Sequence, residues 1–338
     1  MKFIVILTLL FLTACSGTPA QKVRFNELFI ELFDTVTVFQ AYAYSQEEFN
    51  YLSREIVRAE LWRLHQLFDI YNEYAGVNNI RTINNNAGIQ PVQVDPVIIE
   101  MLLLCKQAYA DTNGIVNVAM GPVFNIWHEY RALASQNPES PPALPSMEAL
   151  QAAAMLANIN DVVIDEANNT VFLRYEGMAL DAGGIAKGFA IESAANSAIM
   201  GGFEHFTLSV GGDVRTGLGP PGSETGTWGV GLQDPNELGD IFYVVHVAET
   251  SVFASGDYQR YFFADGIRFH HIIDPRTLMP ASLYRSVTII HPDGGIADIL
   301  ATAAFIMDID EGKALMELYG AEAIWYLHDG TIQFFREG

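Results

Sequence analysis

Residues 180–188 have the sequence LDAGGIAKG, a glycine-rich segment that is followed by a helical pattern over residues 189–200. The pattern predicts a strand that turns through a glycine loop into a helix. Glycines let a ligand approach the backbone, and a helix N-terminus offers free N–H groups and a positive dipole. Lys187 adds a full positive charge that suits a phosphate. Such loops also occur for packing alone, so both interpretations stay open for this segment by itself.

A second cluster of polar residues combines SGDY at 255–258 with HHIIDPRT at 270–277. A histidine beside an Asp-Pro turn can act as a general base near neutral pH, which makes His271 a candidate base. A histidine in a strand is more often a packed, hydrogen-bonded residue, and this alternative stays open.

A third cluster lies in the apolar segment 297–305, where Asp298 and Thr302 are four residues apart. On a helix they share one face. A carboxylate and a hydroxyl one turn apart can supply two oxygen ligands to a hard cation such as Mg²⁺. The alternative is a helix N-cap followed by a threonine that bonds back to its own helix.

Helical and strand patterns alternate along the rest of the chain, without a repeat or a clear linker. The pattern predicts a strand over 29–43, a polar loop over 78–88 and a hairpin over 162–173. It predicts helices over 46–71, 96–111 with Asp95 as N-cap, and 147–157. The class is therefore α+β or mixed α/β.

The composition is that of a globular protein with a large core. The chain has 338 residues, 50% of them hydrophobic and 12% aromatic, which excludes a disordered or fibrous protein. Its net charge of −22 would repel a phosphate backbone, so we expect no nucleic-acid partner. An anionic ligand would need backbone N–H groups, a rare Lys or Arg, or a metal.

The N-terminus resembles a bacterial lipoprotein signal. Two residues, Met1 and Lys2, precede the apolar run 3–12, which is too short to span a bilayer, and the run leads into the sequence LTAC ending at Cys15. We expect residues 1–14 to be a signal peptide, and Cys15 to be acylated and to anchor the protein in membrane lipid on the extracytoplasmic face of the cell membrane. An ordinary signal peptide with a chance cysteine is the alternative. We expect residues 15–28 to be a linker, residues 29–338 to be one domain, and Cys105 to lie in the core.

Together the clusters make this sequence resemble the ApbE family of FAD:protein FMN transferases, from about residue 33 to residue 305. The segments that carry the resemblance are 34–35, 74–84, 121–122 with Trp127, 181–188, 211–213, 231–235, 255–258, 271–277 and 297–302. The resemblance implies one large α+β domain of mixed sheets with packed helices, related to the T-fold.

The resemblance also implies a reaction. Family members bind FAD with Mg²⁺, cut its pyrophosphate, pass FMN to a threonine hydroxyl of an acceptor protein and release AMP. Asp298, Thr302 and the carbonyl of Gly184 would hold the metal. His271 would take the proton from the threonine, with Asp257 or Asp274 orienting it. The residues at positions where the family contacts FAD are Phe33, Tyr74, Ile115, Val116, Asn117, Lys187 and Ile272.

The partners implied are FAD and a membrane-bound or secreted electron-transfer flavoprotein with a threonine motif. Three other functions remain open. In an FAD pyrophosphatase, water would replace the threonine and the products would be FMN and AMP. The other two are a flavin-binding lipoprotein without catalysis and a solute-binding lipoprotein of a transporter. Tyr74 could equally be a core tyrosine.

Overall fold

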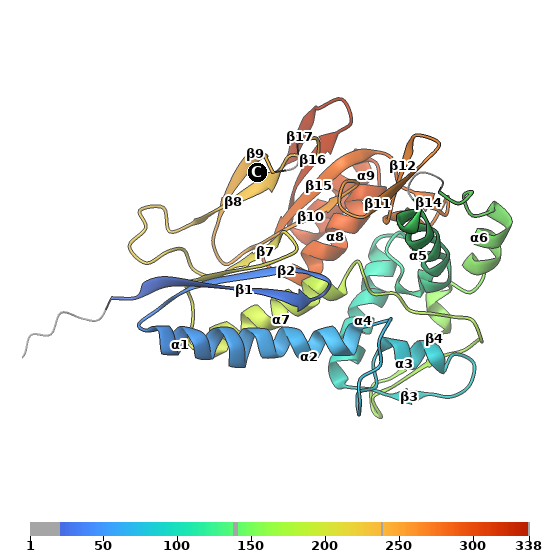
Figure 1. Cartoon of the computed structure of the whole chain (residues 1–338), viewed down its shortest axis with the longest axis horizontal. Coiled ribbons are helices and arrows are strands. Elements are labelled where there is room, and N and C mark those ends of the chain that lie inside the picture. Colours follow the sequence, from blue (N-terminus) through green and yellow to red (C-terminus); the bar gives the residue numbers. More distant parts are fainter. Residues whose placement is uncertain (1–20, 138–140, 238, 337–338) are drawn as a thin grey trace, which may run out of the picture.

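An eight-stranded antiparallel sheet crosses the molecule in the order β1-β2-β6-β7-β10-β15-β16-β17 (Figure 1). The computed structural model describes residues 21–137, 141–237 and 239–336. The strands are β1 (Val23–Leu32), β2 (Thr35–Ala43), β6 (Phe206–Val210), β7 (Asp213–Thr216), β10 (Ser251–Gly256), β15 (Tyr284–His291), β16 (Glu322–Leu327) and β17 (Ile332–Phe335).

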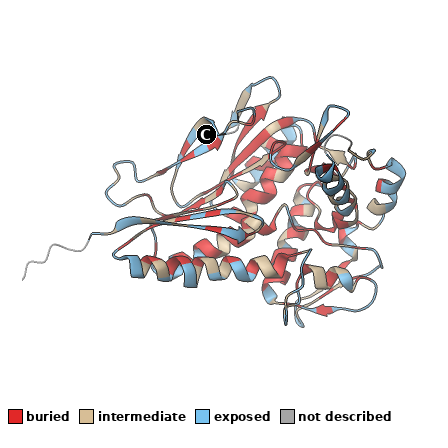
Figure 2. Ribbon diagram, viewed as in Figure 1, coloured by how far each residue is buried: buried red, intermediate tan, exposed pale blue. Residues whose placement is uncertain are grey.

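Helices cover one face of this sheet, and many residues of the helices and strands that meet there are buried (Figure 2). Their apolar side chains form one core cluster. A long helical segment consists of α1 (Gln46–Asn50), the π-helix η1 (Tyr51–Arg58) and α2 (Ala59–Phe68). Helix α7 (Ala186–Met200) packs between α2 and α8 (Gly294–Ile306), and α9 (Ile309–Tyr319) follows. The inner face of α7 carries mainly alanines, so neighbouring helices can approach it closely.

The remaining elements form smaller units around this layer. They are α3 (Ile80–Asn85), α4 (Pro96–Asp111), η2 (Val118–Met120), α5 (Gly121–Gln136), α6 (Met147–Ala154) and η3 (Ile159–Asp161), with the strands β3 (Val92–Gln93), β4 (Val162–Asp165), β5 (Thr170–Leu173), β8 (Trp228–Gln233), β9 (Ile241–Val247), β11 (Tyr261–Ala264), β12 (Ile267–His270), β13 (Ile273–Asp274) and β14 (Met279–Pro280). A second apolar core joins α5 and α6 to β11 and β12.

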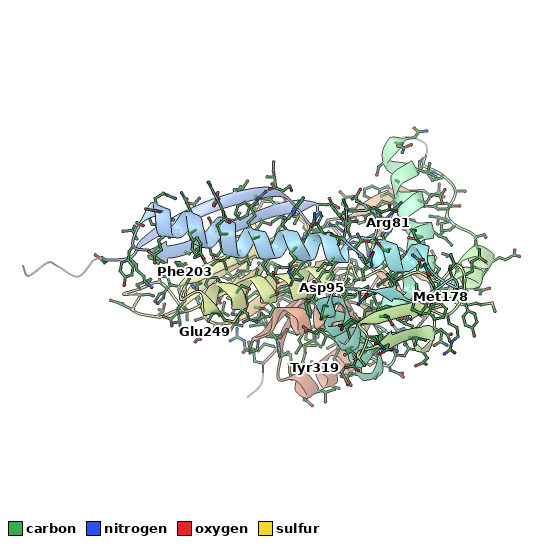
Figure 3. The ribbon with its side chains drawn as sticks, turned by 90° about the horizontal axis from the view of Figure 1, so that it is seen from below. Arg81, Asp95, Met178, Phe203, Glu249 and Tyr319 are labelled. Carbon is green, nitrogen blue, oxygen red and sulfur yellow. The ribbon has the colours of Figure 1, made fainter. Side chains whose placement is uncertain are left out.

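Several predicted elements are confirmed. The helix predicted over 46–71 is present but ends at Phe68, and the one predicted over 147–157 ends at Ala154. Helix α4 begins as predicted, because the Asp95 carboxylate accepts the N–H of Val97. Asp95 also forms an ion pair with Arg63 at 3.1 Å, which ties α4 to α2 on the helical face seen in Figure 3. The 162–173 hairpin is present, and Cys105 is buried.

The strand predicted over 29–43 is wrong, because it is a hairpin of two strands. The chain turns at Phe33 and Asp34, with φ of +51° and +53°, between the paired residues Leu32 and Thr35. Two successive positive φ angles are typical of the two-residue turns that match strand twist. No glycine marks this turn, so the apolar alternation runs through it. The sheet also begins at Val23, within the stretch predicted as a linker.

Two other local predictions are wrong. The predicted polar loop contains α3. This helix begins where Asn79 and Thr82 form a capping box, and its first residue, Ile80, is buried. The residues before the glycine loop are not a strand, since Leu180 bonds to the side chain of Asn84 instead. Helix α7 begins at Ala186, three residues earlier than predicted, which places Lys187 in its first turn.

Among the described residues, no helix combines the length and apolar character needed to cross a bilayer. Cys15 and the expected signal peptide lie outside the described residues.

Candidate functional site

A cavity of about 660 Å³ brings together segments from the whole length of the described chain. This volume lies within the usual range of small-molecule sites. Ten of the predicted site residues line it: Phe33, Ile115, Val116, Asn117, Gly184, Lys187, His271, Ile272, Asp298 and Thr302. Residues as far apart in the sequence as Phe33 and Thr302 therefore share one site.

Tyr74 does not line this cavity. Its hydroxyl donates to Asp69 Oδ2 at 2.7 Å, and burial together with this carboxylate raises the pKa of Tyr74 to about 12. Tyr71, three residues earlier in the same loop, lines the cavity instead. The structure therefore places the loop at the cavity, as predicted, with Tyr71 and not Tyr74 in its lining.

Asp298 and Thr302 lie one turn apart on α8, as predicted. Asp293 is the N-cap of α8, and Thr302 forms none of the back-bonds that Thr112 and Ser135 form elsewhere in the described residues. The alternative of a cap and a back-bonding threonine is therefore wrong. The Asp298 side chain is buried and accepts the N–H of Gly188 at 2.8 Å. Burial raises the pKa of Asp298, while the Lys187 charge and this N–H oppose the increase.

Gly184 lies close to the Thr302 hydroxyl. A Cβ atom added to Gly184 would lie 3.2 Å from the Thr302 hydroxyl oxygen. The described residues contain no group of three His, Cys, Asp or Glu side chains that could hold a metal. A carboxylate, a hydroxyl and a carbonyl are nevertheless the hard oxygen ligands that Mg²⁺ accepts, with phosphates and waters completing its coordination. The residues present fit such a cation.

Lys187 reaches the cavity from the first turn of α7. Its ammonium pairs with the buried carboxylate of Asp213. Burial lowers the pKa of Lys187, and the charge of Asp298 opposes this shift. A phosphate that contacts Lys187 would therefore share the ammonium with Asp213.

His271 lies in the bend directly after β12 and presents a ring without a complete set of hydrogen bonds. Its Nδ1 is buried and has no partner within the described part of the chain. Burial lowers the pKa of His271 to about 3, and the charges of Arg260, His270 and Arg131 add to the decrease. The imidazole is therefore neutral at neutral pH and can accept a proton. The alternative of a hydrogen-bonded core histidine fits His270 instead, which bonds to the carbonyl of Ala281 and to the N–H of Ile272.

The prediction that Asp257 or Asp274 orients His271 is wrong. Asp257 pairs with Arg268 at 3.2 Å and with Arg285 at 3.0 Å. Asp274 pairs with Arg276 at 2.9 Å. Both carboxylates are occupied by arginines that come from neighbouring strands and turns.

Helix α5 contributes residues that the sequence reasoning missed. Phe124, His128 and Arg131 line the cavity at the spacing of one helix face. His128 lies between two further lining residues, since its Nδ1 is 3.1 Å from the Tyr71 hydroxyl and its Nε2 is 3.8 Å from Asp181 Oδ2. No helix is predicted here from the sequence, although the helical spacing of apolar residues over 121–136 is the signal that could have located one. Its orientation toward His271 depends on packing against β11 and β12.

Comparison with known proteins shows a match to one family over most of the chain. The model of the ApbE family matches residues 33–325. The FAD:protein FMN transferase of Treponema pallidum is 33% identical, over 75% of this chain and 72% of its own length. That of Klebsiella pneumoniae is 30% identical, over 75% of this chain and 77% of its own.

Solved structures resemble the fold. The crystal structure of the ApbE protein from Thermotoga maritima superposes with a TM-score of 0.77 and 28% identity, over 93% of this chain and 97% of that one. The apo flavinyl transferase ApbE of Pseudomonas stutzeri superposes with a TM-score of 0.74 and 22% identity, over 93% and 95%. At that identity, the second likeness concerns the fold alone.

Proposed function

This chain belongs to the ApbE family, and from this premise we propose that it is an FAD:protein FMN transferase that uses Mg²⁺ and modifies a threonine hydroxyl. The observation that carries the proposal is one cavity that joins an oxygen-donor set to a neutral histidine with an unpartnered nitrogen. Neither a flavin store nor a solute-binding protein gives a reason for this combination.

The reaction exchanges the phosphoanhydride bond of FAD for a phosphoester bond to the acceptor. The acceptor hydroxyl oxygen bonds to the phosphorus of the FMN half of FAD. The bond between this phosphorus and the bridging oxygen breaks, and AMP leaves with the electron pair. His271 takes the proton of the hydroxyl, because an unassisted alcohol is a poor nucleophile.

Asp298, Thr302 and the carbonyl of Gly184 would hold Mg²⁺ in the cavity. The bound ion would neutralise charge on the diphosphate and stabilise the leaving AMP. The raised pKa of Asp298 supports this role, since a buried carboxylate without a full counter-charge favours a cation beside it.

Apolar side chains would hold the flavin. Phe33, Ile115, Val116 and Ile272 line the cavity, and Tyr71 adds a half-exposed aromatic ring. Flat aromatic ligands stack well on such side chains. Asn117 is an N-cap for η2, because its Oδ1 accepts the N–H of Ala119, so it also shapes the wall of the cavity.

The experiment is an intact-mass measurement on an acceptor domain that carries a threonine motif. The chain that follows Cys15 is mixed with this domain, FAD and Mg²⁺, and a parallel sample contains EDTA. We expect the acceptor to gain the mass of one FMN less water, and the gain to disappear with EDTA. Production of AMP and free FMN without a mass gain would favour the pyrophosphatase. The absence of both a mass gain and AMP would contradict catalysis on FAD.

A further inference from the structure

Two arginines in the cavity lack the partners that other arginines of the chain have. The chain carries a net charge of −22, and ten arginines form ion pairs with carboxylates. Within the described residues, Arg24, Arg131 and Arg260 form none. Arg24 is exposed on the edge strand β1. Arg131 and Arg260 line the cavity, where Arg131 is half-buried and Arg260 is exposed.

The two guanidinium groups come from different elements, and the charge of each affects His271. Arg131 follows His128 by one turn on α5, and Arg260 lies in the loop between β10 and β11. Both lower the pKa of His271, and Arg260 lowers the pKa of Arg131 after the larger effect of burial. Two like charges that line one cavity and act on the same imidazole repel each other, and an anion bound between them would relieve this repulsion.

Asp181 is the one of the four cavity aspartates whose charge raises the pKa of Arg131, but it forms no ion pair with that arginine in the described part of the chain. Asp181 accepts the N–H of Gly183 through Oδ1 at 2.9 Å, and its Oδ2 faces His128 at 3.8 Å. Asp181 forms no ion pair with either arginine within the described residues. The space beside the arginines and His271 is therefore suited to an anion from outside the chain.

We propose that Arg131 and Arg260 bind the phosphate of the FMN half of FAD, beside His271, and remain on that phosphate during transfer. The proposal rests on the proposed function and adds an anion subsite to it. Guanidinium groups present planar pairs of N–H donors that match phosphate oxygens. The phosphate that is attacked would then be held by α5 and the 257–260 loop, and the cation on the diphosphate by α8 and the glycine loop.

This arrangement also gives His271 a reason to become a better base in the complex. A pKa of about 3 in the free protein makes the imidazole a weak base. A phosphate on Arg131 and Arg260 compensates two of the positive charges that lower this pKa. The arrival of substrate would therefore raise the pKa of His271 toward the range in which it can take a proton.

The experiment compares the affinity for FMN and for riboflavin by flavin fluorescence, in EDTA so that no metal contributes. FMN differs from riboflavin by its phosphate. We expect the wild-type protein to bind FMN more tightly than riboflavin, and Arg131→Gln and Arg260→Gln each to reduce this preference about tenfold or more, as for charged hydrogen bonds. Riboflavin affinity should stay within about twofold, since charge removal leaves the apolar wall intact.

Arg24→Gln is the matched control, because it removes the same charge from an exposed strand and should leave both affinities unchanged. Arg131→Lys and Arg260→Lys keep the charge without the planar donors, and should show intermediate preferences for FMN. If a Gln variant also loses its affinity for riboflavin, the Lys variant at the same position tests whether the arginine contributes to phosphate binding. A wild-type protein without a preference for FMN, or a preference that survives both substitutions, overturns the subsite.

The two proposals can fail separately. An arginine-dependent preference for FMN without any flavin transfer would leave the subsite standing and contradict the transferase. Flavin transfer together with a preference for FMN that does not depend on the arginines would support the transferase and contradict the subsite.

Discussion

His270 and His271 are neighbours in the sequence and have opposite environments. Both ring nitrogens of His270 are engaged by backbone groups, which holds it as part of the structure. His271 lines the cavity with Nδ1 unpartnered. The backbone differs at the two positions, since His270 is the last residue of β12 and His271 lies in the bend that follows.

His271→Ala should abolish transfer and preserve FAD binding, because a base acts on the acceptor hydroxyl and not on the flavin. We expect the transfer rate to fall by about a hundredfold or more, as is typical for the loss of a general base. The rate is measured from the acceptor mass and the affinity from FAD fluorescence. Transfer at the wild-type rate would contradict the assigned role.

Asp298→Asn should remove the effect of Mg²⁺ on FAD affinity and lower the transfer activity together with it. The substitution keeps the shape of the side chain and removes the charge that a cation requires. Titration of FAD with Mg²⁺ and with EDTA measures the difference. Asp310→Asn makes the same charge change on the exposed surface of α9 and should retain the metal effect. A metal effect that persists in Asp298→Asn would argue against this ligand.

His271→Gln should also make the stability less dependent on pH in acid. The folded-state pKa of His271 is about 3 and the usual value is 6.5, so between these values the unfolded chain binds a proton that the folded chain does not. Stability is therefore lost as the pH falls through this window, by up to ~1.4 kcal/mol per pH unit for one proton. His128 and His270 shift in the same direction and remain in both proteins.

The measurement is the free energy of unfolding by urea at several values between pH 7 and pH 4. The variant should lose less stability than the wild type over this range. Equal slopes would show that His271 titrates in the folded protein as it does in the unfolded chain.

At the scale of single elements, α3 depends on one buried asparagine. Asn79 is fully buried, accepts the N–H of Thr82, and donates to the carbonyls of Gln66 and Asn72. It therefore joins the end of the α2 region to the loop that carries Tyr71. This contact explains why a polar, asparagine-rich stretch forms a helix here.

Asn79→Ala should destabilise the protein by about 3 kcal/mol, because it removes a cap worth about 1 kcal/mol and two hydrogen bonds to the carbonyls of Gln66 and Asn72 worth about 1 kcal/mol each. Ser146→Ala is the control, since Ser146 is an exposed N-cap with one bond to Ala149 and should cost about 1 kcal/mol or less. Thermal and urea unfolding measure both. Equal losses in the two variants would mean that the donations of Asn79 contribute little.

At the scale of the whole molecule, the cavity is where the acidic chain collects positive groups. Lys187, Arg131 and Arg260 line it, while ten other arginines pair with carboxylates elsewhere. The cavity also holds four aspartates, Asp34, Asp69, Asp181 and Asp298, so its attraction for an anionic substrate depends on individual positive side chains and not on an excess of positive charge.

Cys15→Ser should release the protein from the membrane, because we propose that acyl chains on Cys15 anchor it on the extracytoplasmic side. The proposal rests on the apolar run 3–12 and the sequence LTAC that ends it. Fractionation of cells that express the two forms measures the change, and the mass of the mature wild-type N-terminus should include the lipid. A Cys15→Ser protein that stays in the membrane fraction would contradict the anchor.

The sequence by itself determined the chemistry-bearing segments and most long helices. Side-chain type and helical spacing are local properties of a sequence. They were therefore enough to identify the glycine loop, His271 and the Asp298–Thr302 pair. The same applies to α4 and its cap at Asp95. Metal ligation and the base role came from family resemblance, and the structure adds that these residues share one cavity.

The tertiary structure alone decided which neighbours meet. It placed a turn at Phe33 and Asp34, selected Tyr71 over Tyr74, and directed one face of α5 toward His271. It also engaged Asp257 and Asp274 with arginines. Each of these outcomes depends on contacts between segments that are far apart along the chain, where the packing free energy outweighs local preference, and no local pattern in the sequence records such contacts.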